Sequence, residues 1–164
     1  RVKQSLLDLS KWYKKAGHNF NKIYYRFPYA AYGERADHHH LNTLKEISNE
    51  LMGDNCIHFA FWDHDTGDWI PKMTAQEVYS NFRAFQEGGK VVTYKTVRQG
   101  GVLTQIKVTK DSEAVGGGVV LQHDIQESSV AGTEMFLSYA QKNGLSIVSL
   151  DEVEEFAITK SCQL

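Results

Sequence analysis

The sequence predicts a mixed α/β fold with parallel strands, and three observations support this class. Short β-rich runs alternate with segments whose apolar residues recur at helical spacing. That alternating order is typical of parallel strands joined by right-handed crossovers. The chain has 164 residues, 41% hydrophobic and 23% charged, which is enough to bury a core in a globular protein. We therefore expect an open sheet or part of a barrel.

The first half of the chain is predicted to alternate helices and strands. Apolar periodicity and β-rich runs indicate, in order, a helix over 2–16, a strand over 22–27, a helix over 41–51 and a strand over 56–62. Thr74 and Glu77 have the spacing of a capping box, which predicts the start of a third helix. Gly88 and Gly89 are expected to end that helix.

The second half begins with two β-rich runs around a pair of glycines. Residues 90–98 and 102–108 flank Gly100 and Gly101, which predicts a β-hairpin or a lid-like insertion. The elements expected after it are a buried strand over 119–121, a helix over 129–142, a last strand over 146–150 and a short helix opening at Asp151.

Charge and cysteine content exclude some classes and leave one question open. The net charge of −2 provides no basic excess for nucleic acid or an anionic membrane, and the apolar runs are too short to span a bilayer. Cys56 and Cys162 are too few for a disulfide scaffold, and no C-x-x-C occurs. We expect two separate thiols, with a bridge between them as the alternative in an oxidising compartment.

Polar clusters follow three of the predicted strands. They occupy residues 26–29, 63–69 and 122–124. The carboxyl ends of parallel strands carry the site in α/β folds, so we expect these clusters to share one face. They combine a guanidinium, carboxylates, an imidazole and aromatic rings. Such a set can perform acid/base hydrolysis, because a carboxylate orients an imidazole for proton transfer.

The three clusters resemble motifs of a known family. Arg26-Phe27-Pro28-Tyr29, Asp65-Thr66-Gly67-Asp68-Trp69 and Leu121-Gln122-His123 are similar, in this order, to the R-x-P-Y, D-x-x-D-W and L-x-H motifs of the polysaccharide deacetylase (NodB-homology, carbohydrate esterase family 4) domain. The similarity covers residues 2–158. It implies that residues 1–164 are the C-terminal part of one parallel, (β/α) barrel-like domain, incomplete in this chain and with the hairpin as an insertion.

The resemblance implies hydrolytic N-deacetylation of N-acetylglucosamine in a polysaccharide, peptidoglycan in preference to chitin. His123 then protonates the leaving amine as the general acid, and Asp68 holds and tunes that imidazole. Arg26 holds the aspartate that serves as the catalytic base. An extracytoplasmic location, either periplasmic, secreted or at the cell wall, follows from the same resemblance.

Four further residues are expected to contact the substrate on the same ground. The backbone N–H of Tyr29 helps to bind the tetrahedral oxyanion, and Pro28 shapes the turn that aims it. Trp69 and Leu121 line the pocket for the acetyl methyl group. Apart from the resemblance, Tyr94 or Arg98 in the hairpin is a further candidate for substrate contact.

Two motifs of the family do not occur in the sequence. T-F-D-D-G supplies the base and one metal ligand, and H-(S/T)-x-x-H supplies two more ligands. We therefore expect a divalent metal, zinc in this family, whose ligands come from an N-terminal segment of the same domain, and we assign no metal ligand within this chain. The competing interpretation is an inactive, glycan-binding remnant of the fold. A generic α/β hydrolase is a third, but it needs a nucleophile and no G-x-S-x-G occurs.

Each candidate also has an ordinary structural interpretation. Arg26 is then a surface cation, Asp68 a helix cap and His123 a hydrogen-bonded core histidine, while Tyr29 and Trp69 are core aromatics.

The remaining histidines are not expected to form a metal site. Residues 38–40 are three consecutive histidines, and adjacent side chains at a helix start point in different directions. His64 is expected to pack or hydrogen-bond locally.

Overall fold

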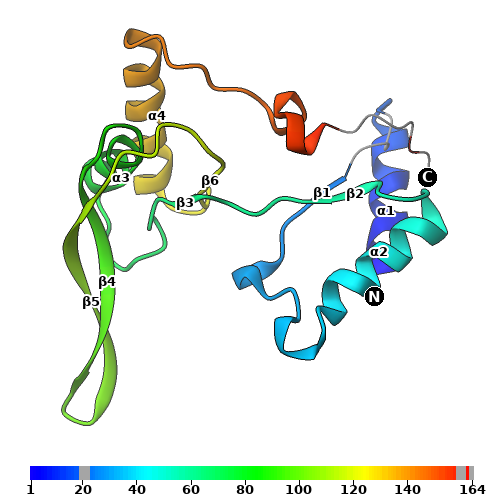
Figure 1. Cartoon of the computed structure of the whole chain (residues 1–164), viewed down its shortest axis with the longest axis horizontal. Helices are drawn as coiled ribbons and strands as arrows, with labels where there is room; N and C mark the ends of the chain where they lie inside the picture. The colour runs from blue at the N-terminus through cyan, green and yellow to red at the C-terminus, as the bar shows by residue number, and fades with distance from the viewer. Residues whose placement is uncertain (19–22, 158–161, 163–164) are drawn as a thin grey trace. The chain divides into compact units, whose positions relative to one another are not determined.

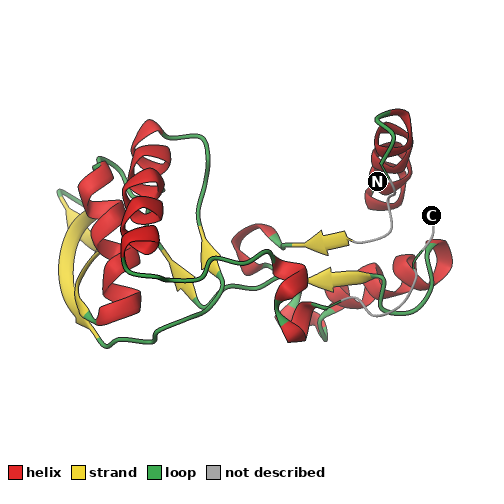
Figure 2. Cartoon of the chain, turned by 90° about the horizontal axis from the view of Figure 1, so that it is seen from above, coloured by secondary structure: helices red, strands yellow, loops and turns green. Residues whose placement is uncertain are grey.

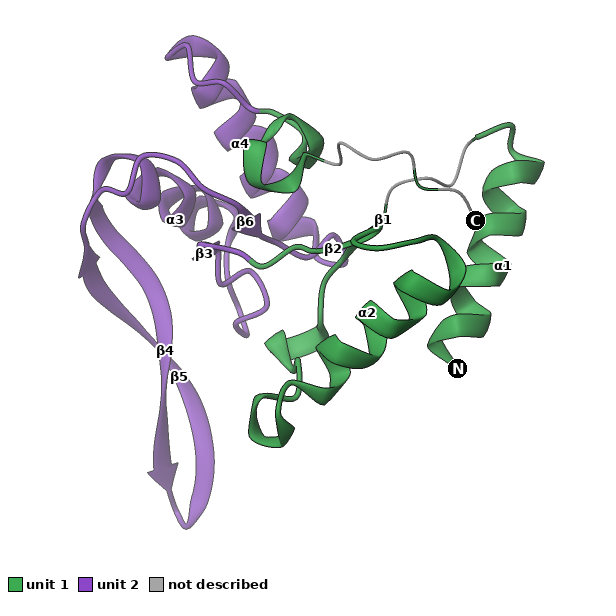
Figure 3. Cartoon of the chain, turned by 45° about the vertical axis from the view of Figure 1, so that its right-hand side comes forward, with its two compact units in different colours: residues 1–61, 148–164 green, residues 62–147 purple. Residues whose placement is uncertain are grey.

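The computed structural model describes residues 1–18, 23–157 and 162, which belong to two compact units. Unit 1 comprises residues 1–61 and 148–164, and unit 2 comprises residues 62–147 (Figure 3). The described residues form four α-helices and three two-stranded sheets. The predicted α/β class is therefore confirmed, although the described strands form small open sheets without a closed barrel.

Unit 1 contains the first two predicted helices. α1 spans Val2–Lys15 and α2 spans His39–Leu51, close to the expected limits. Both are amphipathic, and their buried positions include Leu6 on α1 and Leu44 on α2. The two leucines enter one apolar cluster with the strands of this unit.

The strands of unit 1 are parallel, as expected, but shorter than the sequence suggested. β1 spans Ile23–Tyr25 and β2 spans Ile57–Phe59, with Ile23 paired to Ile57 (Figure 2). Lys22, the first residue of the predicted strand, lies outside the described residues. Both isoleucines are buried in the same cluster as the two helices.

A disulfide ties the C-terminal segment to this core. Cys56 and Cys162 are bonded, with their Cα atoms 5.7 Å apart, and both are buried. The expectation of two separate thiols was therefore wrong. The two cysteines are 106 residues apart in sequence, so no local pattern could have paired them.

Unit 2 begins with a second pair of parallel strands. β3 spans His64–Asp65 and β6 spans Val120–Leu121, with Asp65 paired to Leu121. Leu121 is buried, whereas Val120 is 38% exposed, so only one of the two side chains in this strand joins the core. This pairing sets the segment after β3 beside the segment after β6.

Two helices pack against each other in unit 2. α3 spans Ala75–Glu87 and α4 spans Glu127–Lys142, and the predicted capping box before α3 is confirmed. Their close approach depends on Gly132, because an added Cβ there lies 2.7 Å from the Cβ of Val78. Within residues 1–18, 23–157 and 162, no helix is long and apolar enough to cross a bilayer.

The predicted hairpin is confirmed and is longer than expected. β4 spans Gly89–Gln99 and β5 spans Val102–Ser112, with Tyr94 paired to Lys107 (Figure 1). Lys107 anchors the hairpin to the start of α3, because its Nζ lies 2.7 Å from the nearer carboxylate oxygen of Glu77 and donates to the Lys72 carbonyl at 2.8 Å.

The predicted strand over 146–150 was wrong. Ile147 and Val148 are about half exposed, and the segment has no pairing partner among the described strands. β-branched composition predicts a strand only where a neighbouring strand can satisfy the backbone. Two 3₁₀ turns, Leu150–Glu152 and Glu154–Phe156, follow in place of the expected short helix.

Candidate active site

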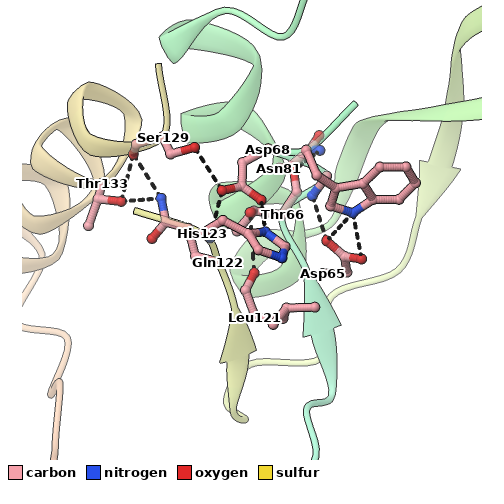
Figure 4. Close-up of polar contacts among 11 residues, drawn as sticks. Asp65, Thr66, Asp68, Asn81, Leu121, Gln122, His123, Ser129 and Thr133 are labelled. Carbon is pink, nitrogen blue, oxygen red and sulfur yellow. Dashed lines mark hydrogen bonds and ion pairs between the residues drawn. The ribbon is translucent and has the colours of Figure 1, made fainter. Parts of the chain in front are cut away.

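Asp68 is a buried carboxylate that accepts three hydrogen bonds. Its side chain is 1% exposed. Oδ2 accepts from the backbone N–H of His123 and from the hydroxyl of Ser129, both at 2.7 Å, and Oδ1 lies 3.0 Å from Nδ1 of His123 (Figure 4). The structure thus brings together the second and third motif segments, which are 55 residues apart in sequence.

The hydrogen bonds to Asp68 determine its charge. Burial acts to raise its pKa, but the hydrogen bonds from the imidazole of His123, the hydroxyl of Ser129 and the backbone N–H of His123 outweigh that effect. The pKa of Asp68 is consequently lowered from its ordinary value of 3.8, and the carboxylate is ionised at neutral pH. An ionised carboxylate only accepts, so Nδ1 of His123 must carry the proton of the bond between them.

His123 presents its other ring nitrogen for chemistry. Its side chain is 31% exposed, and Figure 4 shows one ring nitrogen turned toward Asp68. With Nδ1 donating to Asp68, Nε2 is the position that can take up or release a proton. This fixed tautomer is what a general acid/base histidine requires.

The turn after β3 directs Asp68 inward. Asp65 accepts from the backbone N–H of Gly67 at 2.8 Å and from Nε1 of Trp69 at 3.0 Å. Gly67 has a φ of +68°, and a Cβ there lies 2.9 Å from Cδ1 of Ile70, so the turn requires glycine. With Asp65 holding both sides of the turn, Asp68 is buried while Trp69 remains 37% exposed.

Two buried polar residues fix this turn to its neighbours. The backbone N–H and the hydroxyl of Thr66 both donate to the Leu121 carbonyl at 3.3 Å. Nδ2 of Asn81 donates to the Thr66 carbonyl at 2.7 Å and to the Val92 carbonyl at 2.9 Å. The turn is therefore bonded to β6 on one side and, through α3, to the hairpin on the other.

Side-chain hydrogen bonds also join the start of α4 to the segment after β6. Nε2 of Gln122 donates to the Ser129 carbonyl at 2.8 Å and also contacts the hydroxyl of Thr133. Ser129 is fully buried and its hydroxyl donates to the carboxylate of Asp68. Because it is bonded to the acid and not to the imidazole, Ser129 supports Asp68 and does not have the arrangement of a nucleophile.

Sequence reasoning missed Thr66, Asn81 and Ser129. A signal existed for Asn81, because it lies among Val78 and Phe82 on the apolar face of α3. A polar residue on a buried face must find partners, so its position indicates a structural hydrogen bond. Thr66 and Ser129 had no comparable signal, since their partners are distant in sequence.

The remaining motif residues lie in unit 1. Arg26 is exposed just after β1, and Pro28 and Tyr29 belong to a 3₁₀ turn, Pro28–Ala30. Tyr29 has a φ of 56° and a side chain that is 97% exposed, so the interpretation of this ring as core was wrong. Trp69 is 37% exposed, so its interpretation as a core aromatic was also wrong. The roles expected for Arg26, Pro28 and Tyr29 stay predictions.

We call Asp68 and His123 the acid/imidazole pair. Neither has the purely structural role considered for it from the sequence, a helix cap for Asp68 and a core histidine for His123. Asp68 accepts from side chains and from the backbone of His123, which is not a helix N-terminus, so it is not a helix cap. His123 is hydrogen-bonded but partly exposed, so it is not a core histidine.

The described residues do not provide a ligand set for a metal ion. None of them form a group of three or more histidine, cysteine, aspartate or glutamate side chains able to hold one. In the run of three histidines, His38 stacks on Tyr32 and Nδ1 of His40 contacts the Ala31 carbonyl at 2.8 Å. His64 packs on Phe85 of α3 with 4.4 Å between ring centroids, and its Nε2 lies 3.3 Å from the Gly117 carbonyl, so its partners are not the local ones expected.

Unit 2 therefore contains an ionised, buried carboxylate, a histidine of defined tautomer and an exposed indole on the residue next to the acid. This arrangement can transfer a proton to or from a group placed against Nε2 of His123. No family model matches the chain, and neither a curated protein nor a solved structure has significant similarity to it.

Proposed function

We propose that the chain provides the general-acid part of a polysaccharide N-deacetylase, a hydrolase that removes the acetyl group from N-acetylglucosamine residues, in peptidoglycan in preference to chitin. The single observation that supports this most is the Asp68–His123 pair, with Nδ1 and Oδ1 3.0 Å apart. The pair joins the D-x-x-D-W and L-x-H segments in the roles that the motif resemblance implies for them.

The proposed proton transfer uses Nε2 of His123. When the C–N bond of the tetrahedral intermediate breaks, the bonding electrons go to nitrogen, and Nε2–H supplies the proton that makes the amine a neutral leaving group. The anionic carboxylate of Asp68 stabilises the positive charge of the ring before that transfer. Nδ1–H stays bonded to Asp68 throughout, so the ring keeps its orientation.

The remaining components are assigned to polypeptide outside this sequence. The motif resemblance assigns both the catalytic base and the ligands of a divalent metal, zinc in this proposal, to an N-terminal segment of the same domain, and no group of metal-ligating side chains was found among the described residues. The complete domain in this proposal is barrel-like, as the motif resemblance implies.

The disulfide supports an extracytoplasmic location. Cys56 and Cys162 are bonded, and disulfides persist in oxidising compartments such as the periplasm and the cell exterior. Peptidoglycan is reached from those compartments, which agrees with the proposed substrate.

A second candidate function is a glycan-binding module without catalysis. It is favoured by the exposed ring of Trp69 together with the lack of metal ligands among the described residues. The two candidates differ in whether acetate is released.

The test measures acetate released by the full-length protein from acetylated peptidoglycan and from N-acetylated chitooligosaccharides, with and without a chelator. We expect release that the chelator abolishes and added zinc restores. Binding of either glycan without any acetate, at every metal loading, would replace the deacetylase with the second candidate.

A further inference from the structure

The exposed ring of Trp69, the residue after Asp68, contacts a second exposed aromatic ring. The Trp69 ring lies edge-to-face with that of Tyr94 from β4, with 5.0 Å between the centroids and 74° between the planes. Trp69 is 37% exposed and Tyr94 is 36% exposed. We call these two rings the aromatic ledge.

Hydrogen bonds fix the indole of Trp69 and the backbone near Tyr94. The indole N–H of Trp69 donates to both carboxylate oxygens of Asp65, at 3.0 and 3.2 Å. Two residues before Tyr94 on β4, the backbone N–H and C=O of Val92 are both bonded to the side chain of Asn81. Opposite Tyr94 on β5, Lys107 is bonded to Glu77. The indole of Trp69 and the backbone near Tyr94 are therefore fixed before a ligand binds, which lowers the entropic cost of binding.

The hairpin continues past the aromatic ledge with polar side chains on the same face. Side chains two positions apart on a strand share a face, as do directly paired residues, so Thr96 follows Tyr94 with its partner Gln105. Both are exposed. Aromatic rings followed by a hydroxyl and an amide suit a sugar chain, whose rings have apolar faces and hydroxyl edges.

We propose that the aromatic ledge and the hairpin face beyond it form a subsite for a second sugar ring of the polymer, next to the N-acetylglucosamine presented to His123. This inference rests on the proposed function and extends it to substrate length. Trp69 directly follows Asp68, whose carboxylate is bonded to His123, so the ledge and the acid/imidazole pair share one chain segment. Tyr94 is then a specificity-determining residue, selecting polymer over monosaccharide.

The test compares Tyr94→Ala with two controls in the full-length protein. Tyr94→Phe keeps the ring, and Lys95→Ala changes the next residue, which lies on the opposite face of β4. With an N-acetylated hexasaccharide as substrate, we expect Tyr94→Ala to raise KM about five- to tenfold with kcat nearly unchanged, as loss of one aromatic contact predicts. Both controls should behave as wild type.

A binding measurement separates this inference from the proposed function. Calorimetry of the hexasaccharide with the His123→Ala protein reports affinity without turnover, and Tyr94→Ala in that background should weaken it by the same factor. Weakened binding without any acetate release from wild type would sustain the subsite and overturn the deacetylase. Acetate release with equal KM and equal affinity in Tyr94→Ala, in protein whose circular dichroism is unchanged, would overturn the subsite.

Discussion

The two units hold their motif residues in opposite ways. In unit 2, Asp68 is buried and accepts bonds from His123 and Ser129, so an interior carboxylate holds the partly exposed imidazole. In unit 1, Arg26 and Tyr29 lie on the exposed side of a turn, over an interior that is apolar and tied by a disulfide. Unit 2 thus shows a pre-organised acid/imidazole pair, whereas the described residues of unit 1 show an apolar core stabilised by a disulfide.

This difference has an energetic consequence. A buried polar network is stable only when every member has its partner, because each orphaned group costs about 1–3 kcal/mol. An apolar core tolerates conservative change more easily. We therefore expect substitutions in unit 2 to affect charge and catalysis, and those in the core of unit 1 to affect stability.

The largest expected effect is on turnover. His123→Ala should lower the rate of acetate release by about 10²-fold or more, because the leaving amine loses its proton donor. Circular dichroism should stay close to wild type, while the thermal midpoint should fall modestly, because Oδ1 of the buried Asp68 loses its bond to the imidazole. Arg26→Ala is the matched change in unit 1, and a rate equal to wild type in that variant would contradict the role expected for Arg26. Full activity in His123→Ala would contradict the acid role.

The second effect is on the stability of unit 1. Replacing Cys56 and Cys162 together by serine should lower the free energy of unfolding of that unit by about 3 kcal/mol, because the unfolded chain gains freedom. Hydrogen exchange should show lost protection in α2 and unchanged protection in α3. Equal loss of protection in α2 and α3 would mean that the disulfide does not stabilise unit 1 selectively.

The third effect depends on pH and belongs to unit 2. The folded-state pKa of Asp68 is lowered, so its charge stabilises the fold above the unfolded-state pKa, about 3.9, and this contribution disappears as the pH falls through the folded-state value. Asp68→Asn should thus be less stable than wild type by about 2 kcal/mol at pH 7, with the gap closing below about pH 4. Urea unfolding at a series of pH values from 7 to 2.5 measures this difference in the free energy of unfolding between Asp68→Asn and wild type. Asp124→Asn, at an exposed neighbour, should show no such gap.

The smallest expected effect isolates the support given by Ser129. Ser129→Ala removes one of the bonds that lower the pKa of Asp68, so that pKa should rise, and unfolding should become easier by about 1 kcal/mol. A carbon-detected titration of the Asp68 carboxyl group reports the pKa directly. Ser128→Ala, one position earlier on α4, is the control. An unchanged pKa in Ser129→Ala would show that the two bonds from His123 suffice.

Local features could be predicted because they are encoded within a few residues. The apolar spacing of α1 and α2, the capping box of Thr74 and Glu77, and the hairpin around Gly100 and Gly101 all agree with the structure. Each depends on contacts between residues close in sequence, which hydrophobic periodicity and turn chemistry report. The prediction of a strand over 146–150 was wrong because a strand needs a pairing partner, and the residues of the segment itself do not specify one.

The sequence by itself determined the α/β class, the helices, the hairpin, and the strand-end positions of Asp68 and His123. Only the tertiary structure decided that these two side chains are bonded, that Ser129 supports them, and that Cys56 pairs with Cys162. The physical reason is distance along the chain. Partners 55, 61 and 106 residues apart meet only after helices and strands have packed, and no local pattern specifies which distant groups that packing brings together.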